Sequence, residues 1–200
     1  MTVAPAWQHP EEDQRVVLRG MTWGDYESML GLRGDRAGVR LYYLDGEIEL
    51  MSPAKTHEGR KKTLARLLEL WAMEAGVPLE AYGSWTLKGE LEAAGAEPDE
   101  CYIVGDADRS VPDLVIEVEW SRVTGLAKRE IYRRLGVREL WTLTSSAELV
   151  LATIEGDVWV ERSVSEVLPA LDVRWLSSFL VIEPQSKAVR ALRDALAERK

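Results

Sequence analysis

Two acids and a lysine in the middle of the chain are of the types that together hydrolyse phosphodiester bonds. Asp99 follows Pro98, Glu117 stands inside the apolar run 113–120, and Lys128 belongs to a basic stretch. Two carboxylates that share a site repel each other, and a hard divalent cation such as Mg²⁺ relieves that repulsion. The ion leaves room for a phosphate oxygen and an attacking water, and a lysine offsets charge that develops on the phosphate. These residue types predict a metal-dependent site if the fold brings them together.

The position of Glu117 inside an apolar strand is the strongest of these signals. Side chains alternate along a strand, so Glu117 shares a face with Glu119. A strand covered by helices is apolar on both faces, and a buried carboxylate there is costly unless it is paired or bound to a cation. If residues 100–104 and 113–120 pair as neighbours, Asp99 and Glu117 lie on adjacent strands. The alternative is an edge strand that exposes one face to water.

The lysine and a histidine come from two predicted helices. Lys128 lies in the helix predicted over residues 125–135 and is the first choice for a catalytic lysine. Lys88 is the second choice, and the alternative for either is an ordinary surface lysine. His57 lies near the start of the helix predicted over residues 55–75, where it would orient water or bind phosphate, or else be a structural, hydrogen-bonded histidine.

The rest of the chain alternates short strands with helices, which predicts an α/β fold. Asp45-Gly46 separates two runs of alternating apolar residues and tolerates the positive φ angles of a tight hairpin turn. The C-terminal helix has an apolar face that would either dimerise or pack onto its own domain. Besides the segments already named, the predicted elements are a helix at 22–32, a hairpin of 39–44 with 47–51, strands at 79–88 and 139–144, a hairpin of 149–154 with 158–163, and helical segments within 173–182 and at 186–199.

Composition places the chain among globular proteins. Its 200 residues are 46% hydrophobic, which suits one domain, expected over residues 19–200 after a flexible leader at 1–18. A single cysteine, no secretory signal and no apolar run long enough to cross a bilayer together predict a cytoplasmic location without membrane association.

Charge is unevenly distributed. The net charge of −9 argues against a protein that coats nucleic acid without sequence preference. Residues 55–66 nevertheless carry five cations against one acid, and residues 122–138 carry six against one. These two basic segments would face phosphate groups on one local surface, or would be ordinary solvated helix faces.

Several stretches of the chain, in the order in which they are given below, resemble the PD-(D/E)XK, or restriction-endonuclease-like, superfamily. Within that superfamily they resemble a large bacterial family classed with the restriction endonucleases. The resemblance covers about residues 20–185 and implies a mixed central sheet flanked by helices, with an N-terminal β-hairpin and C-terminal helices. The stretches that carry it are Tyr43-Leu-Asp-Gly-Glu-Ile-Glu-Leu-Met-Ser-Pro53, His57, Gly83-Ser-Trp-Thr-Leu-Lys88, Glu97-Pro-Asp-Glu-Cys-Tyr-Ile103, Pro112-Asp-Leu-Val-Ile-Glu-Val118 and Lys128-Arg-Glu-Ile-Tyr-Arg-Arg-Leu-Gly-Val-Arg-Glu-Leu-Trp141.

The resemblance also implies roles. Glu47, Asp99 and Glu117 match the three acids that bind the metal, and Lys128 matches a lysine displaced from its usual place. That usual place, two residues after Glu117, holds Glu119, so activity requires a lysine from elsewhere. Arg122-Val-Thr also stands where many relatives carry a Ser/Thr-rich turn.

Together these features predict an endonuclease that uses Mg²⁺, with Mn²⁺ as a substitute, and acts on DNA. The catalytic set is Glu47, Asp99, Glu117, Lys128 and His57. One alternative is a binding module for nucleic acid or protein that keeps the nuclease fold without activity, which Glu119 and the acidic net charge favour. Another is a phosphodiesterase acting on nucleotides or RNA. Enzymes that cut both strands are often symmetric dimers, so a homodimer is a further expectation.

Overall fold

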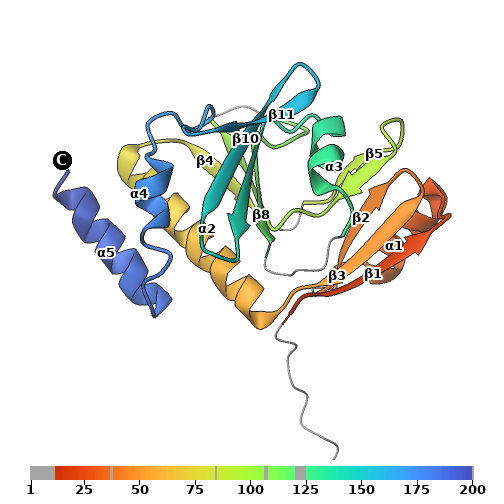
Figure 1. The fold of residues 1–200 in the computed structure, drawn as a ribbon, viewed down its shortest axis with the longest axis horizontal. Coiled ribbons are helices and arrows are strands. Elements are labelled where there is room, and N and C mark those ends of the chain that lie inside the picture. Colours follow the sequence, from red (N-terminus) through yellow and green to blue (C-terminus); the bar gives the residue numbers. More distant parts are fainter. Residues whose placement is uncertain (1–11, 37, 84, 106–107, 120–124, 200) are drawn as a thin grey trace, which may run out of the picture.

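Two β-sheets form the framework of the computed structural model, which describes residues 12–36, 38–83, 85–105, 108–119 and 125–199 (Figure 1). The first sheet has the strand order β1-β3-β2-β6-β5 and the second has the order β11-β10-β9-β8-β7-β4. Helix α3 (Lys128–Arg134) lies between the two sheets, and α2 (Lys55–Ala75) runs beneath the second sheet. The strands of the first sheet are β1 (Gln14–Arg19), β2 (Arg40–Leu44), β3 (Glu47–Ser52), β5 (Leu87–Gly89) and β6 (Ala94–Ala96). Those of the second are β4 (Leu79–Tyr82), β7 (Glu100–Val104), β8 (Leu114–Glu119), β9 (Glu139–Thr144), β10 (Leu149–Glu155) and β11 (Val158–Arg162).

The expected hairpin of β2 and β3 is confirmed. Asp45 and Gly46 have φ angles of 46° and 86°, the positive values that a tight hairpin turn requires. Helix α1 (Trp23–Arg33) covers the outer face of this sheet. Its Tyr26 packs in a buried cluster with Leu41, Tyr43 and Ile48 of the hairpin.

The N-terminal boundary differs from the one expected from the sequence. Residues 14–18, which we placed in a flexible leader, form most of β1 and pair antiparallel with β3. β1 lies at the edge of its sheet, so its burial alternates only between exposed and half-buried. Such a strand carries little hydrophobic signal, because its stability comes from backbone pairing with a partner distant in sequence.

The second sheet is mixed. β7 pairs antiparallel with β8, as expected, whereas β8 and β9 are parallel neighbours. A parallel pair needs a crossover connection, and α3 provides it. The segment predicted as one strand at 79–88 is two strands, β4 and β5, which belong to different sheets.

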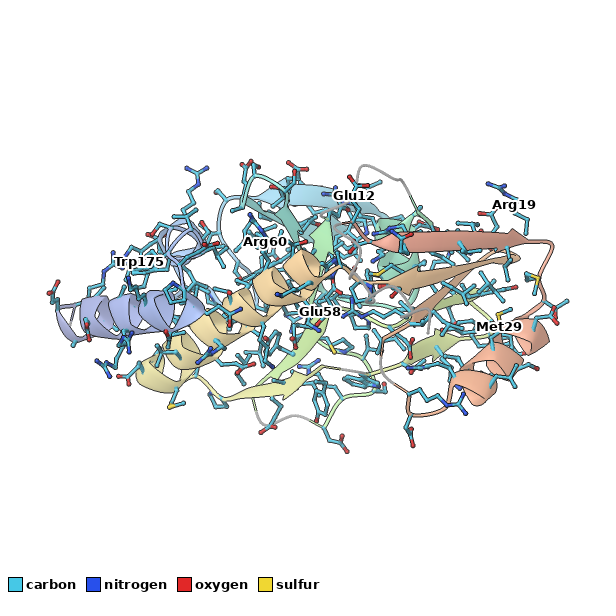
Figure 2. The ribbon with its side chains drawn as sticks, turned by 90° about the horizontal axis from the view of Figure 1, so that it is seen from below. Glu12, Arg19, Met29, Glu58, Arg60 and Trp175 are labelled. Carbon is cyan, nitrogen blue, oxygen red and sulfur yellow. The ribbon has the colours of Figure 1, made fainter. Side chains whose placement is uncertain are left out.

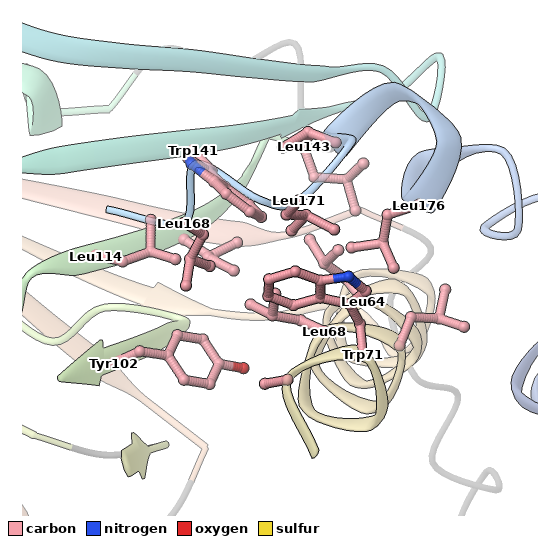
Figure 3. Close-up of a cluster of buried hydrophobic side chains, with 14 of the residues drawn as sticks. Leu64, Leu68, Trp71, Tyr102, Leu114, Trp141, Leu143, Leu168, Leu171 and Leu176 are labelled. Carbon is pink, nitrogen blue, oxygen red and sulfur yellow. The ribbon is translucent and has the colours of Figure 1, made fainter. Parts of the chain in front are cut away.

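β8 is an interior strand covered on both faces, so the edge-strand alternative is wrong. Its Ile116 and Val118 lie in the core that α2 covers, and Val115 lies in the opposite core with α3. Figure 3 shows the first of these cores, where side chains of α2 meet those of β7, β8, β9 and the C-terminal region. The residues labelled there are Leu64, Leu68, Trp71, Tyr102, Leu114, Trp141, Leu143, Leu168, Leu171 and Leu176.

The C-terminal part packs onto its own chain. Helix α4 (Val173–Ser177) and helix α5 (Gln185–Ala197) lie alongside α2 (Figure 1). Ala188 and Leu192 of α5 are fully buried in the same core as α2. The apolar face of α5 is therefore used within the chain. In the described part of the chain, no helix is both long and apolar enough to cross a membrane.

Candidate active site

Asp99 and Glu117 lie opposite each other at one end of the β7–β8 pair. Glu100 pairs with Ile116, so the same register continued by one step sets Asp99 against Glu117. Opposed residues of an antiparallel pair share one face of the sheet. Asp99 is fully buried and Glu117 is 2% exposed. The fold thus buries both carboxylates at the same end of this strand pair.

Glu117 is held by two side chains from α3. The ammonium of Lys128 donates to Oε2 of Glu117, and the hydroxyl of Tyr132 donates to Oε1. Lys128 and Tyr132 are four residues apart and so lie on the same face of the helix. Burial raises the pKa of the Tyr132 hydroxyl and the Glu117 carboxylate raises it further, so Tyr132 remains a hydrogen-bond donor.

Lys128 stays charged despite its burial. Burial lowers the pKa of its ammonium, but the charges and hydrogen bonds of Glu117 and Tyr42 together outweigh burial and the pKa is raised. Its Nζ also donates to the Tyr42 hydroxyl at 2.9 Å and lies 4.1 Å from the centre of the Tyr42 ring. The site therefore contains a fixed positive charge, which is the role expected of Lys128 as the displaced lysine.

The other lysine and the usual lysine position lie apart from this arrangement. Nζ of Lys88, the second choice, contacts Oε1 of Glu27 at 2.9 Å on the surface. Glu119 is exposed at the end of β8. Residues 122–124, where the sequence departs from relatives, lie outside the described residues.

Asp99 is tied to His57, which is itself tied to Asp13. Nε2 of His57 lies 2.9 Å from Oδ1 of Asp99, and its Nδ1 lies 3.0 Å from Oδ2 of Asp13. Oδ2 of Asp99 accepts a hydrogen bond of 2.7 Å from the backbone N–H of Val118. Carboxylates only accept hydrogen bonds, so both ring nitrogens of His57 must donate when both acids are ionised. His57 is thus a buried connector between two acids.

Asp13 also fixes the start of α2. It accepts a hydrogen bond of 2.8 Å from the backbone N–H of Ala54. Burial raises the pKa of Asp13, but the hydrogen bonds from His57 and Ala54, together with the charges of His57 and Arg15, outweigh burial and the pKa is lowered overall. Sequence reasoning missed this residue, because its segment carried no motif and was assigned to a leader.

Arg40 of β2 supplies the positive charge next to Asp99. Its guanidinium contacts Oδ1 of Asp99 and lies 3.4 Å from Nε2 of His57. It also pairs with Glu58 at 2.9 Å. In this arrangement a cationic side chain neutralises each of the two central acids.

Glu47 and Glu49 share a face of β3 but differ in environment. The Glu47 side chain is 36% exposed and pairs with Arg19 at 2.8 Å near the turn of the hairpin. Glu49 is fully buried and accepts from Arg15 at 2.7 Å and from the backbone N–H of Leu126 at 2.6 Å. The structure thus connects Glu49, rather than Glu47, to the segment that enters α3.

Two further contacts link Glu49 to the site. It pairs across the hairpin with Tyr42, whose hydroxyl contacts Lys128. Its partner Arg15 lies 3.7 Å from Asp13. A side chain at Gly125 would collide with the Glu49 carboxylate, so this glycine permits the close approach. A buried acid in a hairpin strand is the same anomaly as Glu117, and that signal could have identified Glu49.

The family model described as Uma2, putative restriction endonuclease, matches residues 23–193. The chain belongs to this Uma2 family. A search among curated proteins finds no match. The restriction-endonuclease-like α/β fold expected from the sequence is confirmed. The match contains Asp99, Glu117, Lys128 and His57 but starts after Asp13.

Restriction-endonuclease-like families such as Uma2 generally use divalent metals, and the donor types here fit one. Asp99, directly before β7, and Glu117 of β8 offer hard carboxylate oxygens, the ligands that Mg²⁺ and Mn²⁺ prefer. Among the described residues, no three Asp, Glu, His or Cys side chains are grouped closely enough to enclose an ion. Arg40 and Lys128 contact the oxygens that would serve as ligands. A metal would therefore replace protein cations at these two acids.

Proposed function

We propose that this Uma2-family chain is a Mg²⁺-dependent endonuclease that hydrolyses phosphodiester bonds in DNA. The observation that supports it most is the buried pair Asp99 and Glu117 with the Lys128 ammonium on Glu117. Burying two carboxylates costs stability unless each is paired, hydrogen-bonded or bound to a cation. Groups with costly, strongly coupled charges gather at functional sites.

Asp99 and Glu117 would hold the metal ion, with Glu49 as the nearby buried acid of β3. A bound Mg²⁺ would polarise the phosphate and supply a nucleophilic water at neutral pH. Lys128 can orient a water or donate to a phosphate oxygen, because Tyr42 and Glu117 fix its ammonium. Tyr132 fixes the second oxygen of Glu117, and Val118 and His57 fix both oxygens of Asp99. The chain's own residues thus orient the acids and the lysine in advance.

A binding module without catalysis is the rival proposal, and one observation favours it. Both oxygens of Asp99 and both oxygens of Glu117 already have protein partners. If no metal displaces Arg40 and Lys128, these ion pairs only stabilise the fold. Metal binding therefore separates the two proposals.

The decisive experiment measures cleavage and metal binding together. Supercoiled plasmid and a folded RNA are incubated with the protein in Mg²⁺, in Mn²⁺ and in chelator. We expect metal-dependent nicking of the plasmid, lost by at least about a hundredfold in Lys128→Met and retained in the matched surface variant Lys88→Met. Calorimetry should detect Mn²⁺ binding that Glu117→Gln removes.

The remaining outcomes are distinct. Cleavage of RNA but not of plasmid would replace DNA with RNA as the substrate. Metal-independent retention of nucleic acid without cleavage would support the binding module. No Mn²⁺ binding by the folded wild type would contradict the metal-dependent proposal altogether.

A further inference from the structure

The two basic segments of the chain differ in how far their charges are neutralised. In the segment at 122–138, every cation of the described residues pairs with a carboxylate. Arg134 makes two contacts to Asp45, at 2.6 and 2.7 Å, and Arg133 contacts Asp157 at 2.6 Å. The remaining pairs are Lys128 with Glu117, Arg129 with Glu161, both Arg133 and Arg134 with Glu130, and Arg138 with Asp113. These cations therefore neutralise carboxylates of the protein itself.

The first half of α2 is different. Lys55, Lys62 and Arg66 are exposed, and their spacing of seven and four residues places them along one face of the helix. Within the described residues, Lys55 and Lys62 have no hydrogen bond or ion pair, and Arg66 contacts only the neutral Gln185, at 3.4 Å. We call these three residues the α2 basic stripe.

The acid nearest in sequence does not neutralise the stripe. Glu58 is engaged by Arg40 at 2.9 Å and by Lys61 at 2.7 Å. Figure 2 shows Arg60 and Glu58 on opposite sides of α2. Glu58 lies one helical turn from both Lys55 and Lys62, but its carboxylate is already paired with Arg40 and Lys61.

A groove runs beside the stripe. It has a volume of about 1040 Å³ and lies between the first turns of α2 and residues 180–185. Lys55 and Arg60 contribute cations to its wall, and Glu183 contributes an acid that acts on Arg60. Gln185, also in its wall, donates to the backbone carbonyl of Gly59 at 2.9 Å.

Lys55 lies in the same helical turn as His57, whose ring contacts Asp99, but on the opposite, exposed side of α2. From Lys55 to Arg66 the stripe extends about 16 Å along the helix, enough for several consecutive phosphates of a nucleic acid strand. The rest of the chain is strongly acidic, since the whole chain has a net charge of −9 although residues 55–66 contribute +4 to it. Phosphate groups are therefore attracted to this surface and repelled from most others.

We propose that the α2 basic stripe binds the sugar-phosphate backbone of the nucleic acid and that the basic helix α3 does not. This inference rests on the proposed function for its substrate class, and it assigns the surface on which the sugar-phosphate backbone lies.

Two double variants with equal charge change test it. Lys55→Gln with Lys62→Gln removes two charges from the stripe, and Arg133→Gln with Arg134→Gln removes two from α3. Binding of a short fluorescent DNA duplex, and of RNA of the same sequence, is measured by anisotropy in chelator over a range of salt. Melting temperatures and Mn²⁺ calorimetry confirm that both variants keep the fold and the metal site.

We expect the stripe variant to bind about tenfold or more weakly at low salt and to lower the slope of log affinity against log salt by roughly two. The α3 variant should keep the wild-type slope. An unchanged slope in the stripe variant, an equal loss in the α3 variant, or no binding by the wild type would overturn the inference. If the α3 variant melts early, Arg36→Gln with Arg193→Gln serves as the control of equal charge.

These outcomes are separable from the proposed function. Plasmid nicking by wild type, with unchanged binding in the stripe variant, would remove the stripe and leave the nuclease. Weakened binding in the stripe variant, without metal-dependent cleavage by wild type, would keep the surface and remove the catalytic proposal.

Discussion

Lys128 reaches the carboxylate of Glu117 from the helix that follows its strand, although the position two residues after Glu117 holds Glu119. A lysine on the helix thus supplies Glu117 with the charge that a lysine at the strand position would otherwise supply. A helix that crosses over β8 and β9 can do this because its first turn lies against the face on which Glu117 stands. An ammonium at this point therefore does not depend on the local sequence of β8.

The Glu117–Lys128 pair should be strongly coupled. Lys128→Met leaves a buried carboxylate without its cation, and we expect a loss of about 3–5 kcal/mol in the free energy of unfolding. Glu117→Gln combined with Lys128→Met should recover most of that loss, because no buried charge then remains unpaired. Urea unfolding of the single and double variants measures the coupling.

The exposed pair Glu27 and Lys88 provides the matched control, with both side chains 43% exposed. Its double-variant cycle should give less than about 1 kcal/mol. Strictly additive effects at Glu117 and Lys128 would contradict their direct pairing.

Asp13 should act on the site through His57. Asp13→Asn removes the carboxylate that holds Nδ1 of His57 and leaves Asp99 and Glu117 in place. Outer partners of this kind usually change metal affinity by about 10–100-fold. We expect Mn²⁺ binding, measured by calorimetry, to weaken to that degree.

Glu12→Gln is the control for Asp13, since Glu12 is its exposed neighbour. It should leave Mn²⁺ affinity unchanged. Equal affinities for wild type and Asp13→Asn would show that His57 is held well enough by Asp99 alone.

Glu49 and Glu47 should differ in what they contribute to stability. Glu49→Gln replaces a buried carboxylate that faces Arg15 and the Leu126 N–H, and we expect a loss of about 3 kcal/mol or more. Glu47→Gln disrupts only a surface pair with Arg19 and should cost less than about 1 kcal/mol. Thermal and urea unfolding provide both values. Loss of Mn²⁺ binding in Glu47→Gln at unchanged stability would instead identify Glu47 as the first metal-binding acid.

Cys101 should be inert in the folded protein. Burial, followed by the charges of Glu100 and Glu117, raises the pKa of its thiol from 9.0 to about 12. The thiolate fraction at neutral pH is therefore about a thousandfold lower than for an ordinary thiol, and the thiolate is the reactive form. Native protein should react with a disulfide reagent far more slowly than protein in denaturant.

The raised thiol pKa also has a consequence at high pH. The folded state favours the protonated thiol, so the contribution of Cys101 to stability is complete below about pH 9 and declines as the pH rises towards 12. Cys101→Ser should reduce this alkaline decline in unfolding experiments. Rapid labelling of the native protein at pH 7 would contradict the burial of this residue.

Local patterns in the sequence determined much of the framework. The bounds of α2 agree with the expected 55–75, because Gly76 takes the left-handed conformation that ends a helix. Asp45-Gly46 specified its hairpin for the same kind of reason, since the turn depends on neighbouring residues alone. The anomaly of Glu117 in an apolar strand also pointed correctly to a buried charge, because alternation along a strand is a local property.

Tertiary structure decided which side chains meet those acids. Lys128 rather than Lys88 contacts Glu117. Asp13 reaches His57 from the position just before β1, whose first residue, Gln14, pairs with the distant Ser52. Glu47 and Glu49 lie on the same side of β3, and they differ only in how far other segments of the fold bury them. The two basic segments likewise look alike in sequence, and only the carboxylates around α3 distinguish them from α2. Ion pairing depends on distances between elements that are remote in the chain, and local periodicity carries no information about those distances.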